Sequence, residues 1–183
     1  MSCRQLRIDR RFHGPPDSGN GGYVAGLVAG ALGGSDCTVT LHRPPPLDHL
    51  LDLQVTESNA ELLDGDKRIA SAVPEQLELD IPFPPPFGQA LSAQDRFSGH
   101  QFHRFPSCFV CGPDRRPGDG LAIYPGDVAG QVAATWTPGA DLAFPDGNVR
   151  PEFLWAALDC PGYFADEKTA GLALLGRMTA RLE

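Results

Sequence analysis

The sequence lacks any long apolar run. No stretch approaches the roughly 20 consecutive apolar residues that a transmembrane helix needs. The N-terminal stretch MSCRQLRIDR also lacks the apolar core of a secretion signal. We therefore expect a cytoplasmic protein that has no membrane partner.

Basic residues and cysteines are also scarce. Lys and Arg number 15 against 23 Asp and Glu, and the resulting net charge of −8 argues against a general affinity for nucleic acid. A single anionic ligand stays compatible with this charge, because a basic pocket can form locally on an acidic protein. The five cysteines are an odd number without disulfide-rich spacing, so reduced thiols are the expected state.

Proline and glycine, in contrast, are abundant. The 18 prolines and 21 glycines among 183 residues indicate many sharp connections. The length suits one domain or two small fused units. Two similar patterns favour two units, residues 1–79 and 108–183, joined by a linker over residues 80–107 that is rich in proline and aromatics. Its five phenylalanines argue for a linker that lies against the protein surface rather than a disordered one.

The first unit follows the order strand, helix, then several antiparallel strands. Apolar residues on alternate positions predict strands over residues 6–12, 37–41 and 51–55. Asp64-Gly65 is a hairpin-turn signal between two further apolar runs.

A helix is predicted over residues 23–32, YVAGLVAGAL. Its bulky apolar residues recur at helical spacing, and its remaining face carries Ala25, Gly26, Ala29 and Gly30. A helix that is apolar on one side and small on the other is expected to be buried on most sides. A sheet wrapped around it would explain the glycines, since each glycine weakens an isolated helix.

The second unit repeats part of this pattern. Two short strands are predicted around Gly126, with Trp136 on one face, and a helix is predicted to begin at Pro151. Pro161 and Gly162 are predicted to end that helix. Alternation over residues 178–182 predicts a last strand, after which the unit is cut short relative to the first.

Several of these segments resemble the hotdog-fold thioesterase superfamily. The stretch SCFVCGPDRRPGDGLAIYPGDVAGQVAATW is similar to the start of a hotdog domain, and NGGYVAGLVAGAL resembles the turn that leads into its central helix. RPPPLD and LLDGDKRIASA resemble strands of the acyl-CoA thioesterase branch. The resemblance implies an α+β fold, an antiparallel sheet wrapped around a central helix, in two tandem units that pair sheet to sheet, the second incomplete. It also implies an acyl-CoA or acyl-carrier thioester bound where the units meet.

Asp159 and Gly22 are the predicted catalytic residues. Asp159 follows Pro151 by the spacing that separates the catalytic acid from the glycine turn in the family, and a charge in the apolar segment FLWAALDCPG needs an explanation. Asn20-Gly21-Gly22 corresponds to the family's glycine turn, where the Gly22 amide can stabilise an oxyanion. The alternatives are a helix-start turn capped by Asn20 or Ser18, and an Asp159 that binds backbone near Pro161.

Only one composite site is expected. Ala29 takes the place of an acid in the first helix, and Pro151 has no N–H to offer in the second. Asn20, Gly21 and Arg150 are the predicted substrate-binding residues. Two other acids, Asp17 near the glycine turn and Glu152 in the first turn of the second helix, carry less weight. The helix dipole explains an acid at the position of Glu152.

A cluster of possible metal ligands lies at His100, His103, Cys108 and Cys111. These residue types can bind zinc. Their spacing is not a common finger pattern, and buried reduced cysteines are the alternative that we favour. We therefore expect no catalytic metal and no cofactor.

The predicted function is hydrolysis of an acyl thioester, in which a carboxylate activates water or attacks the carbonyl carbon. The alternative is a non-catalytic acyl-binding or scaffold protein. A hydratase is disfavoured because neither predicted helix contains the histidine that such enzymes pair with an aspartate. The sequence leaves open whether the chain forms a homodimer.

Overall fold

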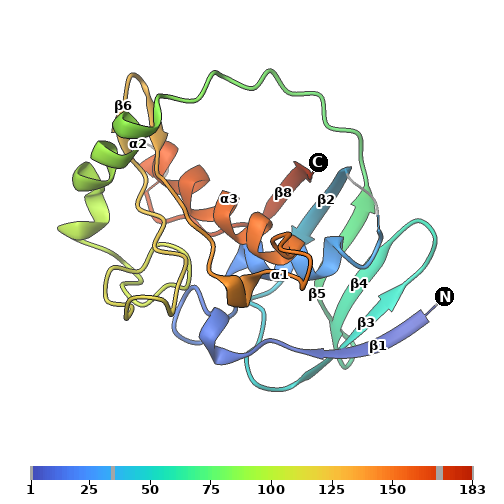
Figure 1. The fold of residues 1–183 in the computed structure, drawn as a ribbon. Helices are drawn as coiled ribbons and strands as arrows, with labels where there is room; N and C mark the ends of the chain where they lie inside the picture. Colours follow the sequence, from blue (N-terminus) through green and yellow to red (C-terminus); the bar gives the residue numbers. More distant parts are fainter. Residues whose placement is uncertain (1, 34–35, 168–170, 183) are drawn as a thin grey trace.

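The computed structural model describes residues 2–33, 36–167 and 171–182. Figure 1 shows a sheet on one side of the molecule, two long helices beside it, and loops with short helices on the other side. Within the described ranges, no helix combines the length and apolarity needed to cross a membrane.

Six strands form one antiparallel sheet. In chain order they are β1 (Ser2–Arg7), β2 (Asp36–Leu41), β3 (Leu50–Val55), β4 (Ala60–Asp64), β5 (Lys67–Pro74) and β8 (Arg177–Arg181). Their order across the sheet is β1-β3-β4-β5-β2-β8, and each neighbouring pair is antiparallel. The antiparallel sheet expected from the sequence is confirmed.

The first strand is shorter than predicted. It ends at Arg7, and Arg10–Phe12 form a 3-10 turn, η1. The turn forms because the Asp9 carboxylate accepts a hydrogen bond from the Arg11 N–H at 2.8 Å, which offers the backbone an alternative to the strand. Ile8, between strand and turn, is fully buried.

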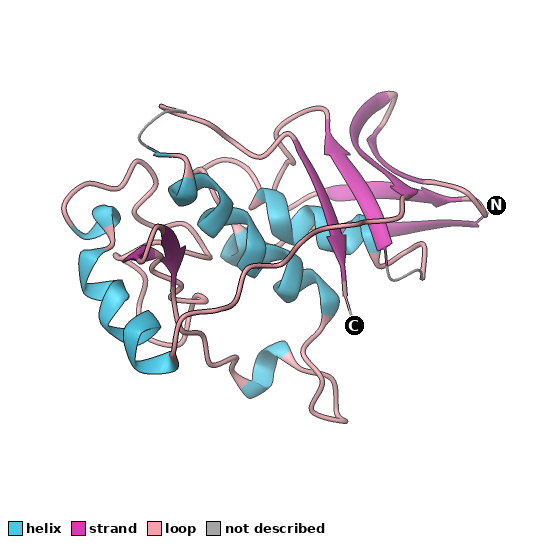
Figure 2. Ribbon diagram, turned by 90° about the horizontal axis from the view of Figure 1, so that it is seen from above, coloured by secondary structure: helices cyan, strands magenta, loops and turns pink. Residues whose placement is uncertain are grey.

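Helix α1 (Gly21–Ala29) packs against both the sheet and α3 (Pro151–Ala165). Seen from above in Figure 2, the paired helices lie between the sheet and the loop region. A Cβ atom on Gly22 would lie 2.5 Å from the Trp155 carbonyl oxygen, and one on Gly26 would lie 2.5 Å from Glu152 Cα. The small face of α1 therefore serves close approach of a second helix. A surrounding sheet, the explanation expected from the sequence, does not account for these two glycines.

Helix α3 continues beyond the predicted stop. Pro161 lies inside the helix, which runs on to Ala165. Proline removes one helical hydrogen bond, but packing holds the following turn, because the Phe164 ring lies edge-on to Phe97 with centroids 4.6 Å apart. Tertiary contacts outweigh the local break here.

Strand β8 extends the sheet formed by the first half of the chain. It pairs with β2 in antiparallel register, with Thr38 opposite Thr179. The hydroxyl oxygens of these two threonines lie 2.5 Å apart. The predicted strand at residues 178–182 is confirmed, and its partner is a strand from the other half.

The linker predicted over residues 80–107 contains helices that the sequence pattern did not indicate. They are α2 (Phe87–Ala93) and the 3-10 turns η2 (Gln94–Arg96) and η3 (Ser98–His100). Its phenylalanines divide into two groups. Phe83, Phe87 and Phe102 are exposed, whereas Phe97 belongs to the core and Phe105 packs against it.

The strands predicted around Gly126 form a small separate hairpin, β6 (Gly126–Val128) and β7 (Gln131–Ala133). The turn lies at Ala129-Gly130, where both residues have positive φ, as a two-residue hairpin turn of type I′ requires. Trp136 is half-buried beyond the end of β7. A short 3-10 turn, η4 (Ala140–Leu142), precedes α3.

Candidate functional site

A cavity of about 720 Å³ opens beside the first turn of α1. Its walls come from residues 14–21, which lead into α1, residues 41–45 at and after the end of β2, the loop 102–111, the second half of α3 and residues 172–178. Much of the lining is apolar, and its aliphatic and aromatic members include Leu41, Phe102, Leu158, Phe164, Leu174 and Met178.

Asp159 projects from α3 at the wall of this cavity, opposite the start of α1. Its Oδ2 atom accepts a hydrogen bond from the Gly22 N–H at 2.8 Å and one from Asn20 Nδ2 at 3.1 Å. Asn20 is buried and also caps α1, because its Oδ1 accepts from the Tyr23 N–H at 2.9 Å. One asparagine therefore fixes both the helix start and the carboxylate.

Burial raises the pKa of Asp159 to about 6, because removal from water penalises the charged form. The hydrogen bonds from Gly22 and Asn20 favour the carboxylate and limit this rise, whereas the nearby Cys108 adds to it. A carboxylate whose pKa lies just below neutral pH suits proton transfer near pH 7.

Gly22 and Gly21 occupy different positions at the start of α1. The Gly22 amide, predicted to face an oxyanion, donates to Asp159 instead. Gly21 lines the cavity at the first position of the helix. An N–H at that position has no partner within the helix and suits an anionic ligand.

Arg150, a predicted substrate-binding residue, lies at the opposite end of α3. It is not among the described residues that line the cavity. Its guanidinium donates to the Asp141 carbonyl, lies 3.6 Å from the Glu152 carboxylate and stacks over Phe153. Its role in substrate binding stays a prediction.

Arg177 lines the cavity and pairs with Glu75 at 3.2 Å. Arg43 and Arg104 also line the cavity, and both are exposed. Neither forms an ion pair within the described part of the chain. Glu167 also lines this cavity, so the cavity wall carries both negative and positive side chains.

Three buried cysteines meet at another wall of the same cavity. The Sγ atom of Cys160 lies 3.0 Å from that of Cys111 and 3.9 Å from that of Cys108. Hydrogen bonds from Cys111 and Cys160 lower the pKa of the Cys108 thiol, and the contact with Cys108 raises the pKa values of the other two thiols.

His103 joins this cluster, whereas His100 does not. The Nε2 atom of His103 lies 3.2 Å from Cys111 Sγ, and burial lowers the pKa of its imidazole. His100 instead contacts the Gln94 carbonyl at 3.1 Å. The sequence spacing indicated His103, Cys108 and Cys111 but not Cys160, whose only signal was its place beside Asp159.

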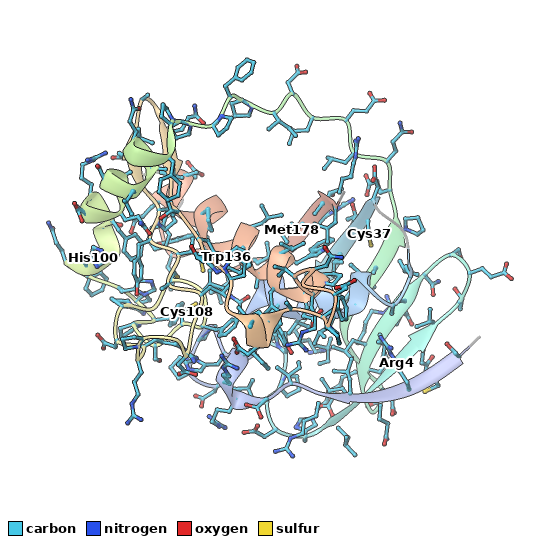
Figure 3. The ribbon with its side chains drawn as sticks, viewed as in Figure 1. Arg4, Cys37, His100, Cys108, Trp136 and Met178 are labelled. Atoms are coloured by element: carbon cyan, nitrogen blue, oxygen red, sulfur yellow. The ribbon has the colours of Figure 1, made fainter. Side chains whose placement is uncertain are left out.

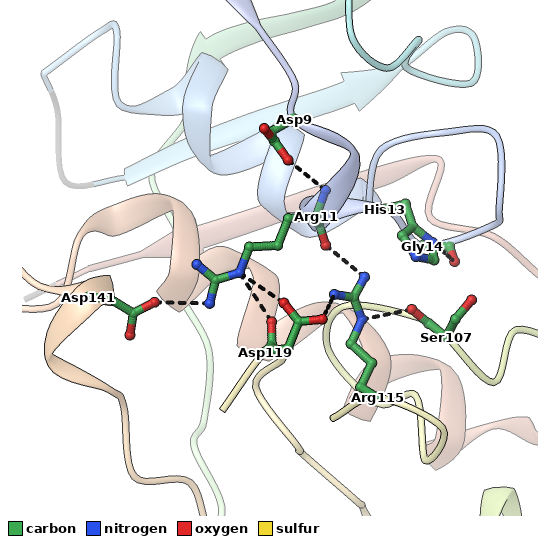
Figure 4. A network of polar contacts seen from close by, with 8 residues as sticks. All are labelled: Asp9, Arg11, His13, Gly14, Ser107, Arg115, Asp119 and Asp141. Atoms are coloured by element: carbon green, nitrogen blue, oxygen red, sulfur yellow. Dashed lines mark hydrogen bonds and ion pairs between the residues drawn. The ribbon is translucent and has the colours of Figure 1, made fainter. Parts of the chain in front are cut away.

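An arginine network fixes the loop that carries Cys108 and Cys111 (Figure 4). Arg115, whose side chain is 8% exposed, donates to the carbonyls of Ser107 and Arg11 at 2.8 and 2.7 Å and pairs with Asp119. Arg11 pairs with Asp119 and, at 2.9 Å, with Asp141. The cysteine loop is therefore held to the η1 turn independently of the sulfur atoms.

Comparisons with known proteins add little to this geometry. No protein-family model matches the sequence, and no curated protein matches it. Among solved structures, a chain from Novosphingobium aromaticivorans DSM 12444, described as a "putative thioesterase", is 15% identical with a TM-score of 0.30. The match covers 46% of this chain and 43% of that chain, which is less than half of either. A likeness at this TM-score supports no assignment of function.

Proposed function

We propose that the protein hydrolyses acyl thioesters, with acyl-CoA as the expected substrate, at the junction of α1 and α3. The observation that carries this proposal is the Asp159 carboxylate, which two donors hold by one oxygen at the wall of a largely apolar cavity. Thioester hydrolysis needs a positioned carboxylate for the water and donors for the oxyanion. The start of α1 can supply such donors.

In the proposed reaction, Asp159 acts as a general base through its second oxygen, Oδ1. It takes a proton from a water molecule, whose oxygen forms a bond to the thioester carbonyl carbon while the carbonyl electrons move to oxygen. The tetrahedral intermediate then collapses and the C–S bond breaks. The departing thiolate takes up the proton from Asp159, which leaves a carboxylic acid, a thiol and the regenerated carboxylate.

The N-terminus of α1 stabilises the oxyanion in this proposal. Gly21 offers an N–H at the first position of the helix, where the helix dipole also favours negative charge. Gly22 and Asn20 act as positioning residues through their hydrogen bonds to Asp159.

The cavity lining supports an acyl group attached to an anionic carrier. The apolar side chains suit a hydrocarbon chain. The guanidinium groups of Arg43 and Arg104 suit the phosphates of coenzyme A. The acyl-carrier alternative, a homodimer and a cytoplasmic location stay predictions.

Two related units also belong to the proposal, over residues 1–79 and 108–183 with the linker 80–107 between them. Two observations support this division. The second position of each helix packs on the other helix, as Gly22 does on Asp159 and Glu152 does on Gly26. The strand after each helix pairs with its counterpart, β2 with β8.

Thiol release from a series of acyl-CoA esters of increasing chain length tests the proposal. We expect catalytic hydrolysis with a chain-length optimum. Tight acyl-CoA binding by calorimetry without turnover would contradict catalysis and favour the non-catalytic acyl-binding alternative.

A single-turnover reaction in H₂¹⁸O tests whether the Asp159 carboxylate attacks the carbonyl carbon and is then released by water at its own carbonyl group. A general base places the label only in the released acid. Label in the Asp159 carboxylate, detected by peptide mass spectrometry, would instead show direct attack by the carboxylate on the carbonyl carbon.

A further inference from the structure

The sulfur cluster brings together parts of the chain that are far apart in sequence. Cys108 and Cys111 lie in a loop before β6, and Cys160 lies 49 residues after Cys111 on α3. All three Sγ atoms lie within 4.8 Å of one another. Ligand atoms around a tetrahedral zinc ion with Zn–S bonds of about 2.3 Å are about 3.7 Å apart, which matches this scale.

From this arrangement we infer a structural zinc site whose ligands are Cys108, Cys111, Cys160 and His103. The Cys-x2-Cys spacing of the loop pair is the spacing that zinc sites use. The Cys108 and Cys111 pair comes from a loop and Cys160 comes from α3, so one metal ion would join two separate parts of the fold. This inference does not depend on the proposed thioesterase activity.

His103 supplies the fourth ligand. Its Nε2 atom lies 3.2 Å from Cys111 Sγ. The group whose ligand atoms all lie within 4.8 Å of one another contains the three cysteines without His103, so the imidazole must move toward Cys108 and Cys160 to complete the site. Its Nδ1 accepts a hydrogen bond from the Phe105 N–H at 3.0 Å. Coordination of zinc through Nε2 places the imidazole proton on Nδ1. Nδ1 then no longer accepts the hydrogen bond from the Phe105 N–H and donates to another acceptor instead.

Four protein ligands leave no open position, which makes the ion structural rather than catalytic. Its effect is to hold α3 at the residue next to Asp159 and directly before Pro161. The helix lacks one hydrogen bond at that point because proline has no N–H. The metal therefore reinforces α3 where its own backbone is weakest.

The direct test is metal analysis of the full chain purified from zinc-supplemented cells. We expect one zinc ion per chain by plasma mass spectrometry. Substitution by Co²⁺ should give thiolate-to-cobalt charge transfer and the intense visible bands of a tetrahedral site. Cys160→Ser should lose most of the bound metal.

Cys37 provides a matched control. It is buried in β2 and lies far from the Cys108 loop (Figure 3), so Cys37→Ser should keep one zinc ion. His103→Ala should bind zinc more weakly than the wild type and show an altered cobalt spectrum, because water replaces the imidazole. If Cys160→Ser fails to fold, the wild-type zinc content and cobalt spectrum decide the question.

Thiol counting on the denatured wild-type chain distinguishes the contrary outcomes. Metal-free protein with all five thiols reactive would overturn the inference in favour of plain buried cysteines. Metal-free protein with only three reactive thiols would overturn it in favour of a disulfide between two members of the cluster.

Discussion

The two ends of the α1–α3 pair share a backbone arrangement but differ in chemistry. At one end, Gly22 occupies the second position of α1 and faces Asp159, the ninth residue of α3. At the other end, Glu152 occupies the second position of α3, and the ninth residue of α1 is Ala29. Only the first end combines a glycine turn with an opposing carboxylate.

This difference distinguishes the residues that the packing of the two helices requires from the residues that a reaction requires. Close packing uses small residues at both ends, since Gly22 and Gly26 each lie against α3. The half-buried Asp159 carboxylate, its Asn20 partner and the adjoining cavity are found together at one end. We therefore expect variants at the two ends to have different effects on activity.

The largest contrast is expected between Asp159→Asn and Glu152→Gln. Loss of the general base should lower turnover of acyl-CoA by about 10²- to 10⁴-fold, whereas Glu152→Gln should keep turnover close to wild type. Thiol-release kinetics with both variants, checked for folding by circular dichroism, measure this contrast. Equal losses would place the chemistry elsewhere.

The same Asp159→Asn variant should be more stable than the wild type at neutral pH. The pKa of Asp159 is about 6 in the folded protein and 3.8 in a model compound, a difference worth about 3 kcal/mol. Because the folded pKa is raised, the charged form destabilises the fold fully above about pH 6. This penalty fades as pH falls from 6 to 3.8 and is gone below that. Thermal unfolding from pH 8 to pH 4 should show that the difference in Tm between Asp159→Asn and the wild type closes. A difference that stays constant would contradict the raised pKa.

Gly22→Ala and Gly26→Ala sharpen the comparison at the level of packing. Each added methyl lies within 3 Å of α3 atoms, so each should destabilise the fold by about 2 kcal/mol. Only Gly22→Ala should also lower turnover per folded molecule, because its methyl would lie 2.7 Å from Asp159 Cβ. Urea unfolding together with kinetics under folded conditions distinguishes the two effects.

The smallest expected effect concerns the arginines. Arg43→Ala should raise KM for acyl-CoA by about threefold to tenfold, as expected for loss of one exposed charge contact of about 1 kcal/mol. Arg150→Ala should leave KM unchanged, because Arg150 contacts Asp141 and Phe153 away from the cavity. A rise in KM for Arg150→Ala would instead support the role in substrate binding that the sequence predicts for Arg150.

Local sequence patterns were sufficient for much of the fold. Strands β2 and β3, the turn at Asp64-Gly65 and the two long helices follow from alternation, turn chemistry and helical spacing, all of which act within a few residues. Asp159 also stood out, because a charged residue in an apolar helix is unusual. Its hydrogen bond to Gly22 joins the two residues predicted to act together.

The features that the sequence did not predict depend on distant contacts. Pro161 stays inside α3 because Phe164 packs on Phe97, which lies in a segment predicted to be a linker. Cys160 joins Cys108 only after α3 has docked. The Gly22 amide binds Asp159 rather than facing an oxyanion, and this depends on how closely the helices approach.

The pairing of β2 with β8 has a consequence for how the molecule folds. Thr38 and Thr179 are 141 residues apart, so this ladder closes a very long loop. Contacts of such long range are slow to form, whereas β3, β4 and β5 are neighbours in sequence and can assemble early. During refolding, we expect the amides of β3, β4 and β5 to gain protection from hydrogen exchange first. Strand β8 is expected to join the sheet last. Until then the β2 edge, a template for wrong strand pairing, stays uncovered.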